Sequence, residues 1–173
     1  MLRWLFSHTI QPRARWYVLL FFDDPAVYLQ SLRRLEKKIG RIDYESRSLI
    51  NGRDLDFGKL STKRVLKIIS FQKSFETRHL LDFARRIAQH RPGTDGEAAI
   101  ELEGGYVNAW QVVGLRREPA PENIYIDEGH YASVLLTFDP LGARQMKSTP
   151  PFFLQKPVLT ALGDLRTIMQ NER

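Results

Sequence analysis

The sequence has no cysteine among its 173 residues. This absence excludes disulfide bonds, thiolate catalysis, and zinc or iron–sulfur sites with cysteine ligands. It is compatible with a reducing compartment, and we expect a cytoplasmic protein. The chain also lacks low-complexity tracts and internal repeats. Its length and composition therefore predict one globular domain with a proper core.

The sequence has no apolar run that is long enough to span a membrane. The run at residues 16–22 has only the length of a strand. Because this run is apolar on both faces, it predicts a central strand of a sheet. The first residues resemble a signal peptide, but their apolar stretch is short, and the polar side chains of Gln11, Arg13 and Arg15 come soon after it. We expect residues 1–15 to form a leader segment, residues 16–173 to form a single α+β domain, and the protein to have no membrane partner.

Positive charge exceeds negative charge, with a formal net charge of +6 and a pI of about 9.7. Such a balance favours encounters with polyanions but does not define a function. Basic side chains gather on two expected helices, where a phosphate-binding surface and a solvated helix face are both open interpretations. The candidate anion contacts are Arg33, Arg34, Lys37, Lys38, Arg85 and Arg86.

The order of expected elements predicts an α+β fold. Asp24 and Pro25 begin a helix that Gly40 ends, and Pro157 begins a C-terminal helix. The C-terminal helix is expected to bury an apolar stripe of Val158, Leu162, Leu165 and Met169. A further helix is expected at residues 76–90, capped by Ser74 or Thr77. Strands are expected at residues 16–22, 42–50, 65–71, 98–102, 111–115, 123–126 and 131–138. These elements predict a mixed, mainly antiparallel sheet with a ferredoxin-like βαββαβ start, additional strands and the C-terminal helix.

Polar residues that could form a site gather between residues 98 and 138. Alternation places Glu101 and Glu103 on one strand face, where paired carboxylates could bind Mg²⁺ or divide acid and base roles, or could simply be solvated. Gly104 and Gly105 predict a tight turn with positive φ at one glycine. His130 falls on the apolar side of its strand, which favours a structural role. The candidate pocket consists of Glu101, Glu103, Gly105, Tyr106, Tyr125 and Tyr131.

Three segments of this region carry a wider pattern. Residues 100–106 read Ile-Glu-Leu-Glu-Gly-Gly-Tyr, residues 122–126 read Glu-Asn-Ile-Tyr-Ile, and residues 129–134 read Gly-His-Tyr-Ala-Ser-Val. They resemble Val-Asn-Leu-Asp-Pro-Gly-Tyr, His-Arg-Ile-Tyr-Leu and Gly-Ile-Tyr-Ala-Glu-Val of a bacterial family called domain of unknown function 4416. The resemblance covers most of the chain from about Trp16. Glycines, tyrosines and apolar positions match while most polar positions differ, so the resemblance implies a fold more strongly than a chemistry.

The interpretation that we favour is a non-catalytic cytoplasmic binding or interaction domain, with a protein partner as one candidate. Two alternatives stay open. The first is a metal- or phosphate-dependent enzyme that uses Glu101, Glu103 and Tyr106, and the second is a nucleic-acid binder that uses the basic helix faces. The residues predict no cofactor and no bound metal.

Overall fold

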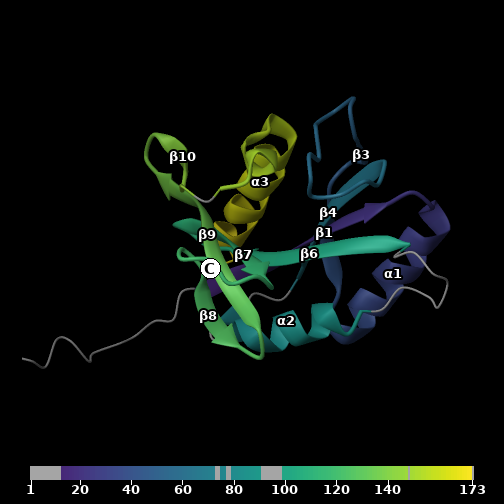
Figure 1. Ribbon diagram of the computed structural model, residues 1–173, viewed down its shortest axis with the longest axis horizontal. Helices are drawn as coiled ribbons and strands as arrows, with labels where there is room; N and C mark the ends of the chain where they lie inside the picture. Colours follow the sequence, from purple (N-terminus) through teal and green to yellow (C-terminus); the bar gives the residue numbers. More distant parts are fainter. Residues whose placement is uncertain (1–12, 73–74, 77–78, 91–98, 148, 173) are drawn as a thin grey trace, which may run out of the picture.

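The computed structural model describes residues 13–72, 75–76, 79–90, 99–147 and 149–172, and these form one sheet with helices on both faces (Figure 1). In chain order the elements are β1 (Arg13–Phe22), α1 (Pro25–Lys38), β2 (Ile42–Glu45), β3 (Leu49–Ile50), β4 (Val65–Phe71), β5 (Phe75–Glu76), α2 (Leu80–Ala88), β6 (Ile100–Val107), β7 (Gln111–Arg116), β8 (Ile124–Asp127), β9 (His130–Asp139), β10 (Gly142–Gln145), the 3-10 helix η3 (Pro151–Leu154) and α3 (Lys156–Asn171).

The central strand of the sheet is β1. It pairs with β6 on one side and with β4 on the other, and every residue after Arg13 is buried. The main path of the sheet runs β10-β9-β7-β6-β1-β4-β2, and the ladders between neighbouring strands are antiparallel. The predicted α+β class with a mainly antiparallel sheet and a C-terminal helix is therefore confirmed.

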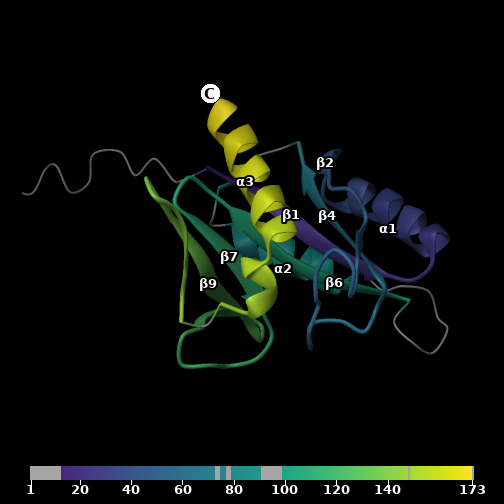
Figure 2. The same cartoon turned by 90° about the horizontal axis from the view of Figure 1, so that it is seen from above.

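Side chains of β1 alternate between two cores because successive residues of a strand point to opposite faces. Trp16, Val18, Leu20 and Phe22 pack with residues of α1 and α2. Tyr17, Leu19 and Phe21 pack with η3, α3 and the loop that carries Phe57. Figure 2 shows α3 crossing one face of the sheet, with α1 and α2 on the other side. We call these two sides the α3 face and the α2 face.

Local signals account for the helix positions. The Asp24 side chain accepts a hydrogen bond from the Ala26 amide at 2.8 Å, and Pro25 follows it in the first turn, as predicted. Gly40 has a φ of +144° just beyond the end of α1. The predicted buried stripe of α3 is also confirmed by Val158, Leu162, Leu165 and Met169.

Several predicted boundaries were wrong where tertiary pairing extends or divides a segment. Residues 13–15, expected in the leader, belong to β1, and Arg13 and Ala14 pair with β5. The helix predicted from residue 76 is α2 and begins at Leu80, with His79 at its N-cap. The proposed caps Ser74 and Thr77 lie outside the described residues. The last predicted strand ended at residue 138, but after Asp139 the chain forms a further strand, β10, which pairs with β9.

Candidate functional site

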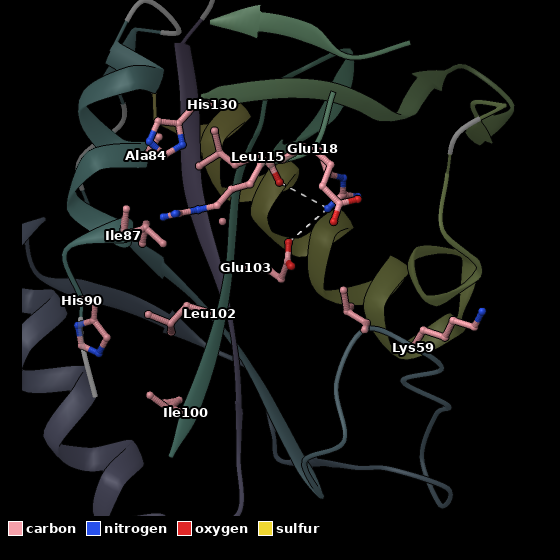
Figure 3. A pocket seen from close by; sticks show the side chains of 15 residues that line it. Lys59, Ala84, Ile87, His90, Ile100, Leu102, Glu103, Leu115, Glu118 and His130 are labelled. Atoms are coloured by element: carbon pink, nitrogen blue, oxygen red, sulfur yellow. Dashed lines mark hydrogen bonds and ion pairs between the residues drawn. The ribbon is translucent and has the colours of Figure 1, made fainter. Parts of the chain in front are cut away.

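A cavity of about 630 Å³ lies where the sheet opens between β6 and β7. β6 pairs with β1 along its whole length, but it pairs with β7 only from Gly105 to Val107. β7 follows β9 instead, as far as Arg116. Residues 100–104 of β6 therefore have a described partner strand on one edge only. The cavity extends through this opening, with Ile87 and two histidines toward α2 and Glu103 and Lys59 on the side of α3 (Figure 3).

Two glycines form the junction at which the two strands separate. Gly105 pairs with Gly114, and a Cβ at Gly105 would lie 2.1 Å from the Val113 carbonyl oxygen and 2.6 Å from Tyr17 Cζ. The Tyr17 hydroxyl donates to that carbonyl at 3.3 Å, so its ring lies across Gly105. The predicted turn at Gly104 and Gly105 was wrong: both lie inside β6, and neither is among the described glycines with positive φ. Close approach of a buried ring, rather than a turn, requires glycine here.

The charged side of the cavity contains an ion pair between β6 and β7. Arg116 Nη1 donates to Glu103 Oε2 at 3.3 Å and to the Leu115 carbonyl at 3.5 Å (Figure 3). Burial raises the pKa of Glu103, Arg116 opposes that increase, and Glu101 adds to it. Arg116 Nη2 is buried and has no hydrogen-bond partner in the described part of the chain. Of the two terminal nitrogens of the guanidinium, the described residues therefore bind only Nη1.

His90, directly after α2, contributes a second set of unpaired polar atoms. The residue is 6% exposed, and neither ring nitrogen has a hydrogen-bond partner among the described residues. Burial, together with the positive charges of Lys38 and Arg34, lowers its pKa to about 4. At neutral pH the imidazole is therefore uncharged and offers one donor and one acceptor.

The lowered pKa of His90 should make the stability of the protein depend on pH. An unfolded histidine binds a proton below about pH 6.5, whereas folded His90 does so only near pH 4. We therefore expect the free energy of unfolding to fall between pH 7 and pH 4 on account of this residue. The expected loss is about 2 kcal/mol, which is less than the full pKa difference implies, because salt screens the contributions of the exposed cations. Urea unfolding at several pH values measures the loss. His90→Gln, which does not titrate, should show a flatter profile; parallel profiles would contradict the assignment.

His130 begins β9 and also lines the cavity. It is 9% exposed and shares its side of the strand with Ala132 and Val134, which pack on the α2 face. The predicted alternation of side chains between the two faces of β9 holds only as far as Val134. A β-bulge between β9 and β7 places both Leu135 and Leu136 in the core of the α3 face.

Comparisons with known proteins identify the family. A family model described as Domain of unknown function (DUF4416) matches residues 12–168. The chain belongs to this family. Searches of curated proteins and of solved structures gave no match. The segment that matches DUF4416 runs from β1 into α3, so it contains all the residues that line the cavity.

In this DUF4416 member the residues predicted to form a pocket are dispersed. Glu101 and Glu103 share a strand face as predicted, but only Glu103 lines the cavity. Tyr106 forms a T-shaped ring contact with Trp16 in the core of the α2 face and accepts a hydrogen bond from Gln111 at 3.2 Å. Tyr125 and Tyr131 form an edge-to-face pair, with centroids 5.4 Å apart, between β8 and β9. The three tyrosines and Gly105 therefore contribute mainly to packing within the sheet and its core.

The predicted anion contacts lie outside the cavity lining, and several bind other parts of the chain. Arg85 donates to both carboxylate oxygens of Glu128, at 2.9 and 2.7 Å. Arg86 donates to the Lys38 carbonyl at 2.6 Å, and Lys38 Nζ donates to the Gln89 carbonyl at 3.0 Å. The side chains of Arg33, Arg34 and Lys37 on α1 are exposed. Part of the basic surface therefore holds α1 and α2 together.

Sequence reasoning missed His90, Arg116 and Arg117 as residues of one cavity. His90 stands alone in the sequence at the end of a helix, and no local pattern marks it. β6 pairs with β1 along its whole length but with β7 over only three residues, and this difference indicates where the sheet opens. Strand register cannot be determined from the sequence of a single segment, so this signal was not accessible.

Two further features were searched for in the described residues, a metal-binding cluster and a membrane-spanning helix. Within it, no group of three His, Asp or Glu side chains is placed to hold a metal ion. The described helices include none with the length and apolar character needed to cross a membrane.

Proposed function

We propose that this DUF4416 member is a binding domain and that its ligand site is the cavity between β6 and β7. The observation that carries the proposal is the combination of this cavity with buried polar atoms in its lining, on His90 and Arg116, that have no hydrogen-bond partner among the described residues. Buried polar groups without partners are rare in native proteins and destabilising. A ligand that supplies the missing partners would therefore gain affinity from each of them.

The placement of the carboxylates supports binding over acid–base catalysis. Glu103 is paired with Arg116, whereas Glu101 and Tyr106 are not among the residues that line the cavity. The volume of about 630 Å³ falls within the range typical of small-molecule sites. The lining also contains several apolar side chains from α2, β6 and β7.

A fragment titration followed by amide NMR tests this proposal. We expect fragments to shift the amide signals of Ile87, Leu102 and Leu115 as one group. Ala88→Phe, which adds a ring to the cavity wall, should abolish these shifts, and Ala143→Phe on exposed β10 should preserve them. Shifts that scatter over the surface, or that survive Ala88→Phe, would contradict the proposed site.

We further propose that β1 to β6 form the ferredoxin-like unit predicted from the sequence. The neighbouring order β6-β1-β4-β2, with antiparallel pairs and with α1 and α2 packed on one face, supports this proposal. A cytoplasmic location and binding of nucleic acid by the basic helix faces stay predictions. A nucleic-acid complex would weaken steeply with added salt.

A further inference from the structure

Resting on the proposed function, we infer that the ligand is a small organic anion with an oxyanion headgroup at Arg116 and an apolar body directed toward α2. Arg116 provides the first argument. A guanidinium carries only donors, so the partner that its buried Nη2 lacks within the described part of the chain is an acceptor. Glu103 contacts Nη1 alone, whereas an arginine pairs strongly with an oxyanion when two of its nitrogens take part.

Three further charged residues line the cavity. Arg117, Lys59 and Glu118 are exposed, and none of them belongs to the Arg116–Glu103 ion pair. Figure 3 shows Lys59, Glu103 and Glu118 on the side of the cavity next to α3.

The side of the cavity toward α2 provides the second argument, because it carries apolar side chains beside the two histidines. Ile87 of α2, Leu102 of β6 and Leu115 of β7 line it, and each of them packs against the core of the α2 face (Figure 3). A headgroup alone fills little of about 630 Å³. The remaining volume suits a short hydrocarbon body, and each buried CH₂ should tighten binding about fourfold.

Four six-carbon probes test the headgroup: hexanoate, hexyl phosphate, hexanol and hexylammonium, each titrated into the ¹⁵N-labelled full chain at pH 7. We expect either anion to bind about tenfold more tightly than hexanol, since it gains a charge-assisted hydrogen bond, and hexylammonium to bind most weakly. The tighter of the two anions distinguishes a carboxylate from a phosphate headgroup. Affinity should rise from butanoate to hexanoate to octanoate.

Two variants connect the effect to the proposed residues. Arg116→Lys keeps a cation beside Glu103 but removes the second guanidinium nitrogen, so hexanoate affinity should fall about tenfold and hexanol affinity should fall by less. Arg33→Gln, on the exposed face of α1 and outside the cavity lining, should weaken neither anion.

Anion binding that is no tighter than hexanol binding, or that Arg116→Lys leaves intact, overturns the inference about the headgroup. The proposed function has a separate readout. It still stands if fragments shift the cavity amides and Ala88→Phe abolishes those shifts, and it fails only if they do not.

Discussion

Replacing Asp43 and Glu172 by alanine together should lower the free energy of unfolding by about 3–5 kcal/mol. Both carboxylates accept hydrogen bonds from Arg15, whose side chain is fully buried beneath them. Arg15 Nε also donates to Ser70 Oγ at 3.3 Å. The double variant would leave a guanidinium charge buried in β1 without either of the carboxylates that pair with it, and burying a charge without its partners is costly. Urea unfolding followed by circular dichroism measures the loss.

A third substitution separates the charge from the packing. Arg15→Met in the background of the double variant removes the unpaired charge and fills similar volume, so we expect the triple variant to recover at least half of the lost stability. The matched surface control is Arg47→Ala, because Arg47 is 66% exposed in its pair with Asp54 and should change stability by less than about 1 kcal/mol. A triple variant no more stable than the double variant would show that the buried charge is not the cause.

Gly105→Ala should destabilise the protein by about 3 kcal/mol, because the new methyl group meets backbone as well as side chain. Its Cβ would lie 2.1 Å from the Val113 carbonyl oxygen and 2.5 Å from the Tyr17 hydroxyl. A change of rotamer cannot move the carbonyl, so β6 and β7 must separate at the junction of the cavity. Urea unfolding gives the loss of stability, and hydrogen exchange of the β7 amides shows whether the strands part.

The control is the same chemical change in a helix. A Cβ at Gly163 in α3 would meet no atom within 4 Å, so Gly163→Ala should raise the free energy of unfolding by about 1 kcal/mol through helix propensity. Alanine variants at the two glycines should therefore shift stability in opposite directions. Equal urea midpoints for Gly105→Ala and the unmodified protein would contradict the close contact of Tyr17 with this strand.

The elements that sequence reasoning placed correctly are those with signals inside one segment. The apolar run of β1 predicted a central strand, and the Asp24–Pro25 pair predicted the start of α1. The apolar spacing in α3 predicted its buried face. In each case the deciding interactions join residues a few positions apart, so their pattern is visible in the sequence.

The elements that were misplaced depend on partners elsewhere in the chain. β5 exists as a strand because it pairs with Arg13 and Ala14, which lie far earlier in the sequence. β10 has an exposed and polar sequence, yet it pairs with β9 through a tight hairpin. Adjacent glycines in a sequence commonly mark turns. Gly104 and Gly105 instead lie inside β6, and the ring of Tyr17 packed across Gly105 explains why a glycine is required there.

The candidate site was predicted only in part. Glu103 was selected for its carboxylate and does line the cavity, but its partner Arg116 and the buried His90 were not selected. The three come from β6, β7 and the end of α2, and the divergence of β6 from β7 gives them a common cavity. Residue type indicates what a side chain can do chemically, and position in the fold decides which side chains act together.

The sequence by itself determined the family, the α+β class, the central apolar strand and the absence of cysteine chemistry, because composition and short-range periodicity carry this information. The tertiary structure decided where the sheet opens, which polar atoms lie buried without partners, and which basic residues bind their own chain. These properties depend on strand register and on burial. Both are set by contacts between segments that are distant in sequence, and no local pattern records them.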